Sequence, residues 1–363
     1  MSIFIYPPDA QQDKGFYSFL IESLQRCAGA RMTADERPLP RLELPRRHES
    51  LWINWNGIRV LVDMSDHIFL FDLPALQLCD LYLKANLNVS MAERVLTAAG
   101  VMDCLHKVKP FLFLSPSLGF CRRIEKVTRF TRMGRWRPFD FCHVVGVYNN
   151  PFLEGVPSAV EEDIPPDPEE THFWIRYQIQ QALLSVGLKG FTRLTNRTNP
   201  ALLDRGGVVR ANMSIQMFLL AMMSSRVTVI NTLPHAVFPW KVMESIALGI
   251  PFVVERRPQI VMPEEMELVP GEHYLELLPE LPDLDKNAAP EELKSYRLFP
   301  RILLERLKER AEWLKGELRD RERMTYMLAA VESYRKHVLT PEFISVFFAD
   351  QVKGAVNAGG SNI

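Results

Sequence analysis

The sequence predicts an α/β protein of two doubly wound domains that face each other across a cleft. The main observation is that short apolar runs, rich in β-branched residues, alternate with helical segments in both halves. This pattern is typical of parallel sheets with crossover helices. The chain has 363 residues, and roughly 100–200 residues per domain leaves room for two. Apolar residues make up 47% and charged residues 24%, as in an ordinary soluble protein.

The first half contains strands and helices in alternation. Its apolar runs of strand length and its stretches with helical periodicity predict the elements in chain order. At position 90 a serine is followed three residues later by a glutamate, which is a capping box that opens a helix. The predicted elements are a strand at Ser2–Tyr6, a helix at Gly15–Cys27, a strand at Ile58–Val62, a helix from Ser90 to near Gly100, and a strand at Phe111–Leu114.

The second half has a clearer strand–helix–strand order. Its helix at 213–224 is almost wholly apolar, which implies burial, and its helix at 239–248 begins with proline and ends before Gly249, the usual asymmetry. The predicted elements are strands at Phe141–Val147, Phe191–Leu194, Val227–Ile230 and Pro251–Val254, and helices at Phe173–Val186, Met213–Ser224 and Pro239–Leu248.

The remaining residues predict a helical C-terminus. Residues 290–337 are charged and helical, and Thr340, Pro341 and Glu342 are suited to begin one last helix. That helix is so apolar that it must dock on the body of the chain. We therefore expect an N-terminal domain at 1–132, a second domain at 133–335, a docking helix at 336–354 and a disordered tail at 355–363.

A basic stretch, Arg122–Arg137, marks the expected domain junction. Its positive charges favour contact with an acidic acceptor, a lipid phosphate or an anionic membrane surface. The alternative is a solvated linker whose charges pair with acids elsewhere in the chain.

Charge and cysteine content exclude several classes of protein. The chain balances 43 basic against 44 acidic residues, so it lacks the basic excess of a general nucleic-acid binder. Its five cysteines form no C-x-x-C pair and no group with zinc spacing, which favours reduced thiols. The N-terminus has no signal-peptide pattern, and the apolar windows are too short to span a bilayer. These features predict a cytoplasmic protein.

The most informative segment is residues 227–255, a strand, a loop, a helix and a second strand. The helix carries Lys241 and Glu244, and it is followed by Gly249, Ile250 and Pro251. Here the sequence resembles the nucleotide-binding domain of GT-B glycosyltransferases, which have two Rossmann-like domains and use nucleotide sugars. In the first half, the turn after Val62 and the later Asp-x-Tyr-x-Lys at residues 80–84 resemble bacterial surface-polysaccharide glycosyltransferases of that fold.

The resemblance and the chemistry agree on a donor site. A carboxylate accepts two hydrogen bonds from vicinal hydroxyls, so Glu244 suits a ribose, and Lys241, one turn before it, adds positive charge for a diphosphate. Asn231 and His235 lie on the loop before this helix, where they can bond a phosphate or a sugar. The structural alternative is an ordinary lysine–glutamate pair on a solvated helix.

Other cations and acids complete the expected site. Arg193 and Arg197 flank the end of a strand, and an arginine fork there suits a pyrophosphate. An inverting transferase needs a general base, and Asp66, Asp63 and His67 follow a strand of the first domain. The alternative is that the two aspartates only cap the turn.

The sequence therefore predicts a glycosyltransferase that moves a sugar from a nucleotide-sugar donor to a hydroxyl acceptor, a glycan or glycolipid. The resemblance implies a final helix that returns to the first domain. No Asp-x-Asp motif lies near these segments, so we expect neither a metal nor another cofactor. Many retaining members of the fold have a second glutamate where this chain has Ala236. Two alternatives stay open: an epimerase or hydrolase of nucleotide sugars on the same scaffold, and a non-catalytic subunit that binds a sugar nucleotide.

Overall fold

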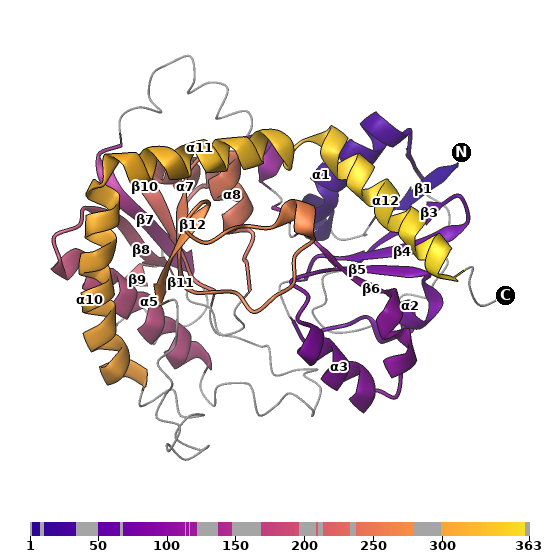
Figure 1. Cartoon of the computed structure of the whole chain (residues 1–363), viewed down its shortest axis with the longest axis horizontal. Coiled ribbons are helices and arrows are strands. Elements are labelled where there is room, and N and C mark those ends of the chain that lie inside the picture. The colour runs from indigo at the N-terminus through magenta and orange to yellow at the C-terminus, as the bar shows by residue number, and fades with distance from the viewer. Residues whose placement is uncertain are drawn as a thin grey trace.

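The fold is known from a computed structural model of the chain. It describes residues 2–7, 11–33, 50–65, 68–112, 114–115, 117–121, 137–146, 168–195, 208–209, 213–232, 237–278 and 299–359. Within these residues the chain forms two six-stranded sheets, each with helices on both faces (Figure 1). The α/β prediction with two mainly parallel sheets is confirmed.

The first sheet is mixed. Strands β4, β5 and β6 run parallel, whereas β3 is antiparallel to both of its neighbours, β1 and β4. The strand order is β2-β1-β3-β4-β5-β6. The strands are β1 (Ile3–Tyr6), β2 (Arg31–Met32), β3 (Leu51–Trp55), β4 (Ile58–Asp63), β5 (Leu81–Ala85) and β6 (Val108–Phe111).

The antiparallel β3–β4 hairpin departs from the parallel arrangement that the sequence predicts. The turn consists of Asn56 and Gly57, both in the left-handed region with φ of 52° and 94°. Asn-Gly is a strong hairpin signal because both residues tolerate positive φ, and such turns match the twist of the flanking strands. The side chain of Asn54 accepts a hydrogen bond from the Gly57 amide at 2.8 Å and so stabilises the turn.

Two helical layers cover the first sheet. Helices α1 (Gln11–Ala28) and α12 (Pro341–Gly359) pack on the face that carries Val60 and Val62. Helices α2 (Leu73–Leu78) and α3 (Val89–Ala98), with the 3₁₀ helix η1 (Met102–Lys107), cover the face of Leu61. Because successive strand residues point to opposite faces, a strand segment buried on both faces is continuously apolar, as Val60–Val62 of β4 is.

The second sheet is parallel throughout, with the order β12-β11-β10-β7-β8-β9. Its strands are β7 (Phe139–Gly146), β8 (Gly190–Thr195), β9 (Val208–Val209), β10 (Ser225–Ile230), β11 (Phe252–Arg256) and β12 (Tyr274–Leu278). Strands β8 and β9 add to one side of β7, and β10 to β12 add to the other. The chain order therefore reverses between β7 and β10, which is a topological switch point.

Helices cover this sheet on both faces as well. Helices α5 (Pro168–Ser185) and α10 (Phe299–Arg319) pack on one face, and α7 (Ile215–Met223) and α8 (Lys241–Ala247) pack on the other. A 3₁₀ turn, η5 (Glu264–Met266), precedes β12. Helix α11 (Arg321–His337) runs from α10 toward α12 along the top of Figure 1.

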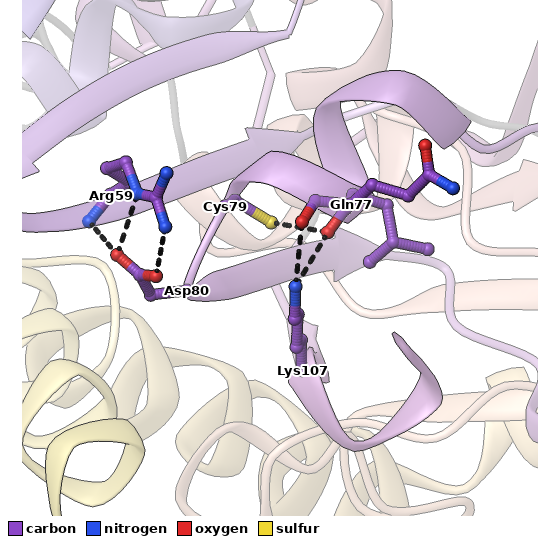
Figure 2. A network of polar contacts seen from close by, with 6 residues as sticks. Arg59, Gln77, Cys79, Asp80 and Lys107 are labelled. Carbon is purple, nitrogen blue, oxygen red and sulfur yellow. Dashed lines mark hydrogen bonds and ion pairs between the residues drawn. The ribbon is translucent and has the colours of Figure 1, made fainter. Parts of the chain in front are cut away.

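Polar contacts hold together the edge of the first sheet where β5 begins (Figure 2). Asp80 accepts hydrogen bonds from the backbone amide and the guanidinium of Arg59, at 2.7–3.1 Å. Lys107 donates to the carbonyls of Leu76 and Gln77 at the end of α2. Asp80 thus joins β4 to β5 at the end of the sheet opposite Lys84, so this first residue of the Asp-x-Tyr-x-Lys pattern has a structural role.

The two halves are joined by backbone and side-chain contacts. Asn86, which follows β5 and has φ of 53°, donates to the carbonyl of Phe238 and accepts from its amide, at 3.2 and 3.1 Å. Nearby, the Val261 amide donates to the Leu87 carbonyl at 2.7 Å. The strand-end loop of the first sheet therefore lies against the segment that leads into α8.

Helix α12 packs on the first half of the chain. It lies along α1, and its rings contact two strands of the first sheet: Phe348 lies 5.4 Å from Trp55, and Phe347 lies 6.0 Å from Phe111, between ring centroids. The helix continues to Gly359, so residues 355–359, expected in a disordered tail, are helical. Ala355 packs against the core there, which extends the helix beyond its expected end.

The first turn of α3 also differs from the expectation. The N-cap is Asn88, two residues earlier than the expected Ser90, and its side-chain oxygen accepts from the Met91 amide at 3.0 Å. Ser90, expected at the cap, donates its hydroxyl to the same Asn88 oxygen. Asparagine and serine are about equally good caps, so the capping-box pattern alone could not choose between them.

Candidate donor-binding site

The expected site residues fall into two groups. Five of them lie within the described residues: Asp63, Arg193, Asn231, Lys241 and Glu244. Four lie outside the described residues: Asp66, His67, Arg197 and His235. Residues 122–136 of the basic stretch also lie outside them.

Glu244 is a fully buried carboxyl group in α8. The hydroxyl of Ser115, which lies just beyond β6 in the first half, donates to Glu244 Oε1 at 3.2 Å. The other oxygen, Oε2, has no hydrogen-bond partner among the described residues. Burial raises the pKa of Glu244 to about 7, although the nearby Ser117 and Ser115 hydroxyls and the Lys241 ammonium favour the ionised form. A buried acceptor without a partner costs free energy, so among the described residues Oε2 is the oxygen of Glu244 that still lacks a donor.

Lys241 precedes Glu244 by one helical turn and is half-buried. Its ammonium donates to the Val144 carbonyl on β7 at 2.8 Å and lies 5.6 Å from the centre of the Phe218 ring. Burial, and then the positive charge of Arg176, lower the pKa of Lys241 to about 8, and Glu244 opposes this shift. Lys241 therefore brings a positive charge to the switch point, and its ammonium has two N–H donors besides the one that bonds Val144.

Asn231 is the first residue after β10, and a histidine on β7 holds its side chain. His143 Nε2 lies 2.8 Å from Asn231 Oδ1, and His143 is fully buried. Burial lowers the pKa of His143 to about 3, which keeps the imidazole neutral. Neither His143 Nδ1 nor Asn231 Nδ2 has a hydrogen-bond partner in the described part of the chain. The next residue, Thr232, donates its amide to both oxygens of the buried Glu255 at 2.7 and 2.8 Å.

Arg193 lies on β8, where it pairs in register with Val144. That register places it beside the backbone segment that binds Lys241, but the structure shows no contact between the two side chains. Of the five described residues, the structure thus brings Asn231, Lys241 and Glu244 to the region where β7 and β10 end, with Arg193 on the adjacent strand.

Asp63 belongs to a separate buried network at the end of β4. Its carboxylate accepts from the Tyr82 hydroxyl at 2.7 Å, from the Lys84 ammonium at 3.1 Å and from the Ser65 amide at 2.8 Å. Lys84, which is fully buried, also donates to the Ser65 hydroxyl at 2.6 Å. Burial alone would raise the pKa of Asp63, but Lys84, Tyr82 and Ser65 outweigh it and lower that pKa.

These contacts argue against a role for Asp63 as general base. A carboxylate that already accepts three hydrogen bonds and has a lowered pKa is a poor proton acceptor. The Ser65 amide bond to Asp63 is the local turn bond that aspartate often makes. The Asp-x-Tyr-x-Lys pattern therefore includes two residues, Tyr82 and Lys84, that hold this carboxylate in place.

Two residues of the donor region were not expected from the sequence. Ser115 comes from a loop of the first half, and no local pattern connects it with Glu244. His143 had a weak signal, since it is a polar residue in an otherwise apolar strand, and such residues need a partner when they are buried. Its partner Asn231 was expected at the site for its own position after β10.

The described residues contain no group of three or more histidine, cysteine, aspartate or glutamate side chains able to hold a metal ion. Among the helices in this part of the chain, none combines the length and the apolarity needed to cross a membrane.

Comparisons with known proteins find similar solved structures. No family model matches the chain, and no curated protein matches it. Two solved structures of Anabaena Alr3699/HepE are similar, one in complex with UDP and glucose and the other with UDP-glucose. They are 12% and 13% identical to this chain, with TM-scores of 0.37 and 0.36, and each match covers 81% of this chain and 72% of the other. At TM-scores this low, the likeness does not assign a function, which has to be argued from the geometry of this chain.

Proposed function

We propose that the chain is a metal-independent glycosyltransferase of the GT-B type, which transfers a sugar from a nucleotide sugar to a hydroxyl acceptor. The observation that carries the proposal is Glu244. Its buried carboxyl group has one oxygen without a partner among the described residues, lies one turn from the cation Lys241, and is reached by a loop from the other half of the chain. A pair of vicinal hydroxyls supplies the hydrogen-bond donors that such a carboxylate lacks.

In the proposed complex, the ribose of the donor binds Glu244 with both of its hydroxyls. One hydroxyl donates to the unpartnered Oε2, and the other takes the place of the Ser115 hydroxyl on Oε1. Lys241 lies on the same side of α8, and its ammonium binds the diphosphate with its remaining N–H groups. Asn231 contributes donors from the end of β10, and Arg193, Arg197 and His235 are further candidates for contacts to the phosphates or sugar.

The proposed reaction needs a base from the first half of the chain. We assign this role to Asp66, with His67 as its alternative, because the carboxylate of Asp63 is already held by Lys84 and Tyr82. The base takes the proton of the acceptor hydroxyl, whose oxygen attacks the anomeric carbon. The bond from that carbon to the diphosphate breaks, and the diphosphate leaves with the electron pair, stabilised by the positive charge of Lys241.

The acceptor in this proposal is a glycan or a glycolipid, and the protein works in the cytoplasm. The basic stretch at 122–137 supports an acidic acceptor or contact with anionic lipid.

Nucleotide binding tests the proposal directly. Titration calorimetry with UDP, GDP, ADP and dTDP should detect binding of at least one of them. Glu244→Ala should weaken that binding about tenfold or more, because a hydrogen bond to a charged group contributes roughly 1.5–3 kcal/mol. Glu265→Ala removes an exposed carboxylate and should leave binding unchanged. If the folded Glu244→Ala variant binds as tightly as the wild type, the site assignment is wrong.

A turnover assay then separates the proposal from its rivals. Incubation with nucleotide sugars and hydroxyl acceptors should give a glycosylated acceptor and a nucleoside diphosphate. An isomerised or hydrolysed donor without transfer would instead indicate the epimerase or hydrolase. Tight binding with no chemistry would indicate a non-catalytic subunit.

A further inference from the structure

The switch point between β7 and β10 holds a polar pair that the proposed function does not yet explain. In parallel sheets, ligands bind beyond the carboxyl ends of the strands at the place where the chain order reverses. Here that place is marked by His143, near the end of β7, and Asn231, the first residue after β10. Their side chains are joined across the two strands at 2.8 Å.

The buried position of His143 is unfavourable for a polar side chain. It is fully buried in a strand whose neighbouring residues are apolar, and a buried polar group costs free energy unless its hydrogen bonds are made. One of its ring nitrogens bonds Asn231, and the other, Nδ1, has no partner among the described residues. A valine at this position would pack into the sheet without that cost, so packing alone does not account for the imidazole.

In the structure the oxygen of the Asn231 amide faces His143 Nε2 at 2.8 Å. Because an amide oxygen only accepts hydrogen bonds, His143 Nε2 must carry the proton and donate it to Oδ1. The amide N–H₂ group is then directed away from the imidazole. Nδ2 of that group has no partner within the described residues. The pair therefore presents two N–H donors at the strand end, and no group in this part of the chain uses them.

A cation reaches the same strand end from α8, on the other face of the sheet. Lys241 binds the carbonyl of Val144, the residue after His143 on β7, and its charge acts on the imidazole. An ammonium group and an oriented amide N–H₂ at one strand end suit an oxygen that only accepts or carries negative charge, such as a phosphate oxygen. A carboxamide presented the other way round, with its oxygen outward, would repel that ligand.

We propose that His143 is a positioning residue, which holds the Asn231 amide so that its N–H₂ group donates to an oxygen of the diphosphate of the bound donor. The inference rests on the proposed function, since it assigns Asn231 a ligand within the same site. His143 itself does not touch the donor. It acts only through the orientation of Asn231.

Because burial holds the pKa of His143 near 3, the imidazole stays neutral across the range in which the protein is assayed. The charged groups around it are Lys241 and Arg176, and both oppose its protonation. The contribution of His143 to binding should therefore be the same at pH 6 and at pH 8, even where Glu244 and Lys241 titrate. The ratio of the wild-type and variant affinities measures that contribution at each pH.

The test uses the full chain and the nucleoside diphosphate that binds it most tightly. His143→Leu removes the hydrogen-bond donor while filling the buried space, and it should weaken binding about five- to tenfold, the effect of losing one neutral hydrogen bond. His143→Gln can donate to Asn231 again and should restore most of the affinity. With the nucleoside monophosphate in place of the diphosphate, the loss should shrink to less than about twofold if the contact is to the distal phosphate.

Two comparisons isolate the effect from general damage to the sheet. Gln180→Met breaks the hydrogen bond from Gln180 Nε2 to the His143 carbonyl at 3.1 Å but leaves the imidazole, so it should keep the affinity within about twofold. Once Asn231 is replaced by leucine, His143→Leu should have no further effect, because the residue it positions is gone.

The possible outcomes are distinguishable. If the wild type binds no nucleotide, the proposed function fails. If it binds but the folded His143→Leu variant binds equally well, or if the losses from His143→Leu and Asn231→Leu simply add, the positioning role is wrong while the proposed function stands. Should His143→Leu not fold, the same decision falls to Asn231→Leu, which must weaken diphosphate binding if the inference is right.

Discussion

Replacing Glu244 with glutamine should make the protein more stable at pH 8. The substitution keeps the shape of the side chain and the oxygen that accepts from Ser115, but it removes the charge. Glu244 is fully buried and one of its oxygens has no partner among the described residues. Its ionised form therefore destabilises the unliganded protein, as is common for groups that serve a ligand rather than the fold.

The size of the effect follows from the pKa of Glu244, which burial raises from 4.5 to about 7. The folded protein holds this proton more tightly than the unfolded chain does, so its contribution to stability is complete below pH 4.5 and is lost as the pH rises through 7. A tenfold difference in proton affinity between the two states corresponds to about 1.4 kcal/mol, which gives about 3 kcal/mol at pH 8. At pH 5 the glutamine variant should gain only about 1 kcal/mol.

Urea denaturation at pH 5 and pH 8 measures this difference, with no nucleotide present. Glu265→Gln neutralises an exposed carboxylate, and should change the free energy of unfolding by less than about 0.5 kcal/mol at either pH. The same Glu244→Gln protein should bind nucleotide more weakly than the wild type. If Glu244→Gln lowers stability at pH 8, the carboxylate is a structural partner of Lys241 and the reasoning is refuted.

Three further predictions concern the reaction and the fold. Turnover should survive EDTA because Lys241 supplies the positive charge for the diphosphate, whereas loss of activity that magnesium or manganese restores would contradict this. Asp66→Asn should lower turnover by about 10²–10⁴-fold with little change in donor affinity. Asp63→Asn should instead lower the free energy of unfolding by about 3–5 kcal/mol, since it leaves the buried Lys84 ammonium without a counter-charge. Gly190→Ala should lower the free energy of unfolding by about 1–3 kcal/mol in a urea titration, because a Cβ there would lie 2.2 Å from the ring of Phe141. The control is Gly316→Ala in α10, where a Cβ meets nothing within 4 Å, and it should not destabilise the protein.

The second sheet could be predicted from the sequence more completely than the first. Parallel strands buried on both faces are continuous apolar runs, so β10 and β11 stand out from the helices between them. In the first sheet, β3 and β5 were not expected, and the direction of β3 depends on a two-residue turn. The Asn56–Gly57 pair is a hairpin signal, and it predicts that β3 runs antiparallel to β4.

The donor region could be predicted only where its residues are close in sequence. Lys241 and Glu244 share one short helix, so their spacing suggested a site. Ser115 and His143 reach the same region from other strands, and only the packing of the two halves brings them there. For Asp63 the sequence predicted the wrong kind of contact. Its position after a strand suggested a general base, but the sequence alone could not assign the buried Lys84 as its ion-pair partner.

The place of α12 has a consequence for how the protein is made. Its Phe347 and Phe348 complete the apolar face of the first sheet against Phe111 and Trp55, although nearly the whole chain separates the two elements. The ribosome makes the strands of the first sheet well before this helix. Until residues 341–359 are made, α1 covers that face without α12, and the part that α12 would cover is exposed to aggregation or to chaperones that bind apolar surface. A chain cut short before residue 341 therefore lacks the rings that pack on Trp55 and Phe111 and leaves part of this apolar face open to water.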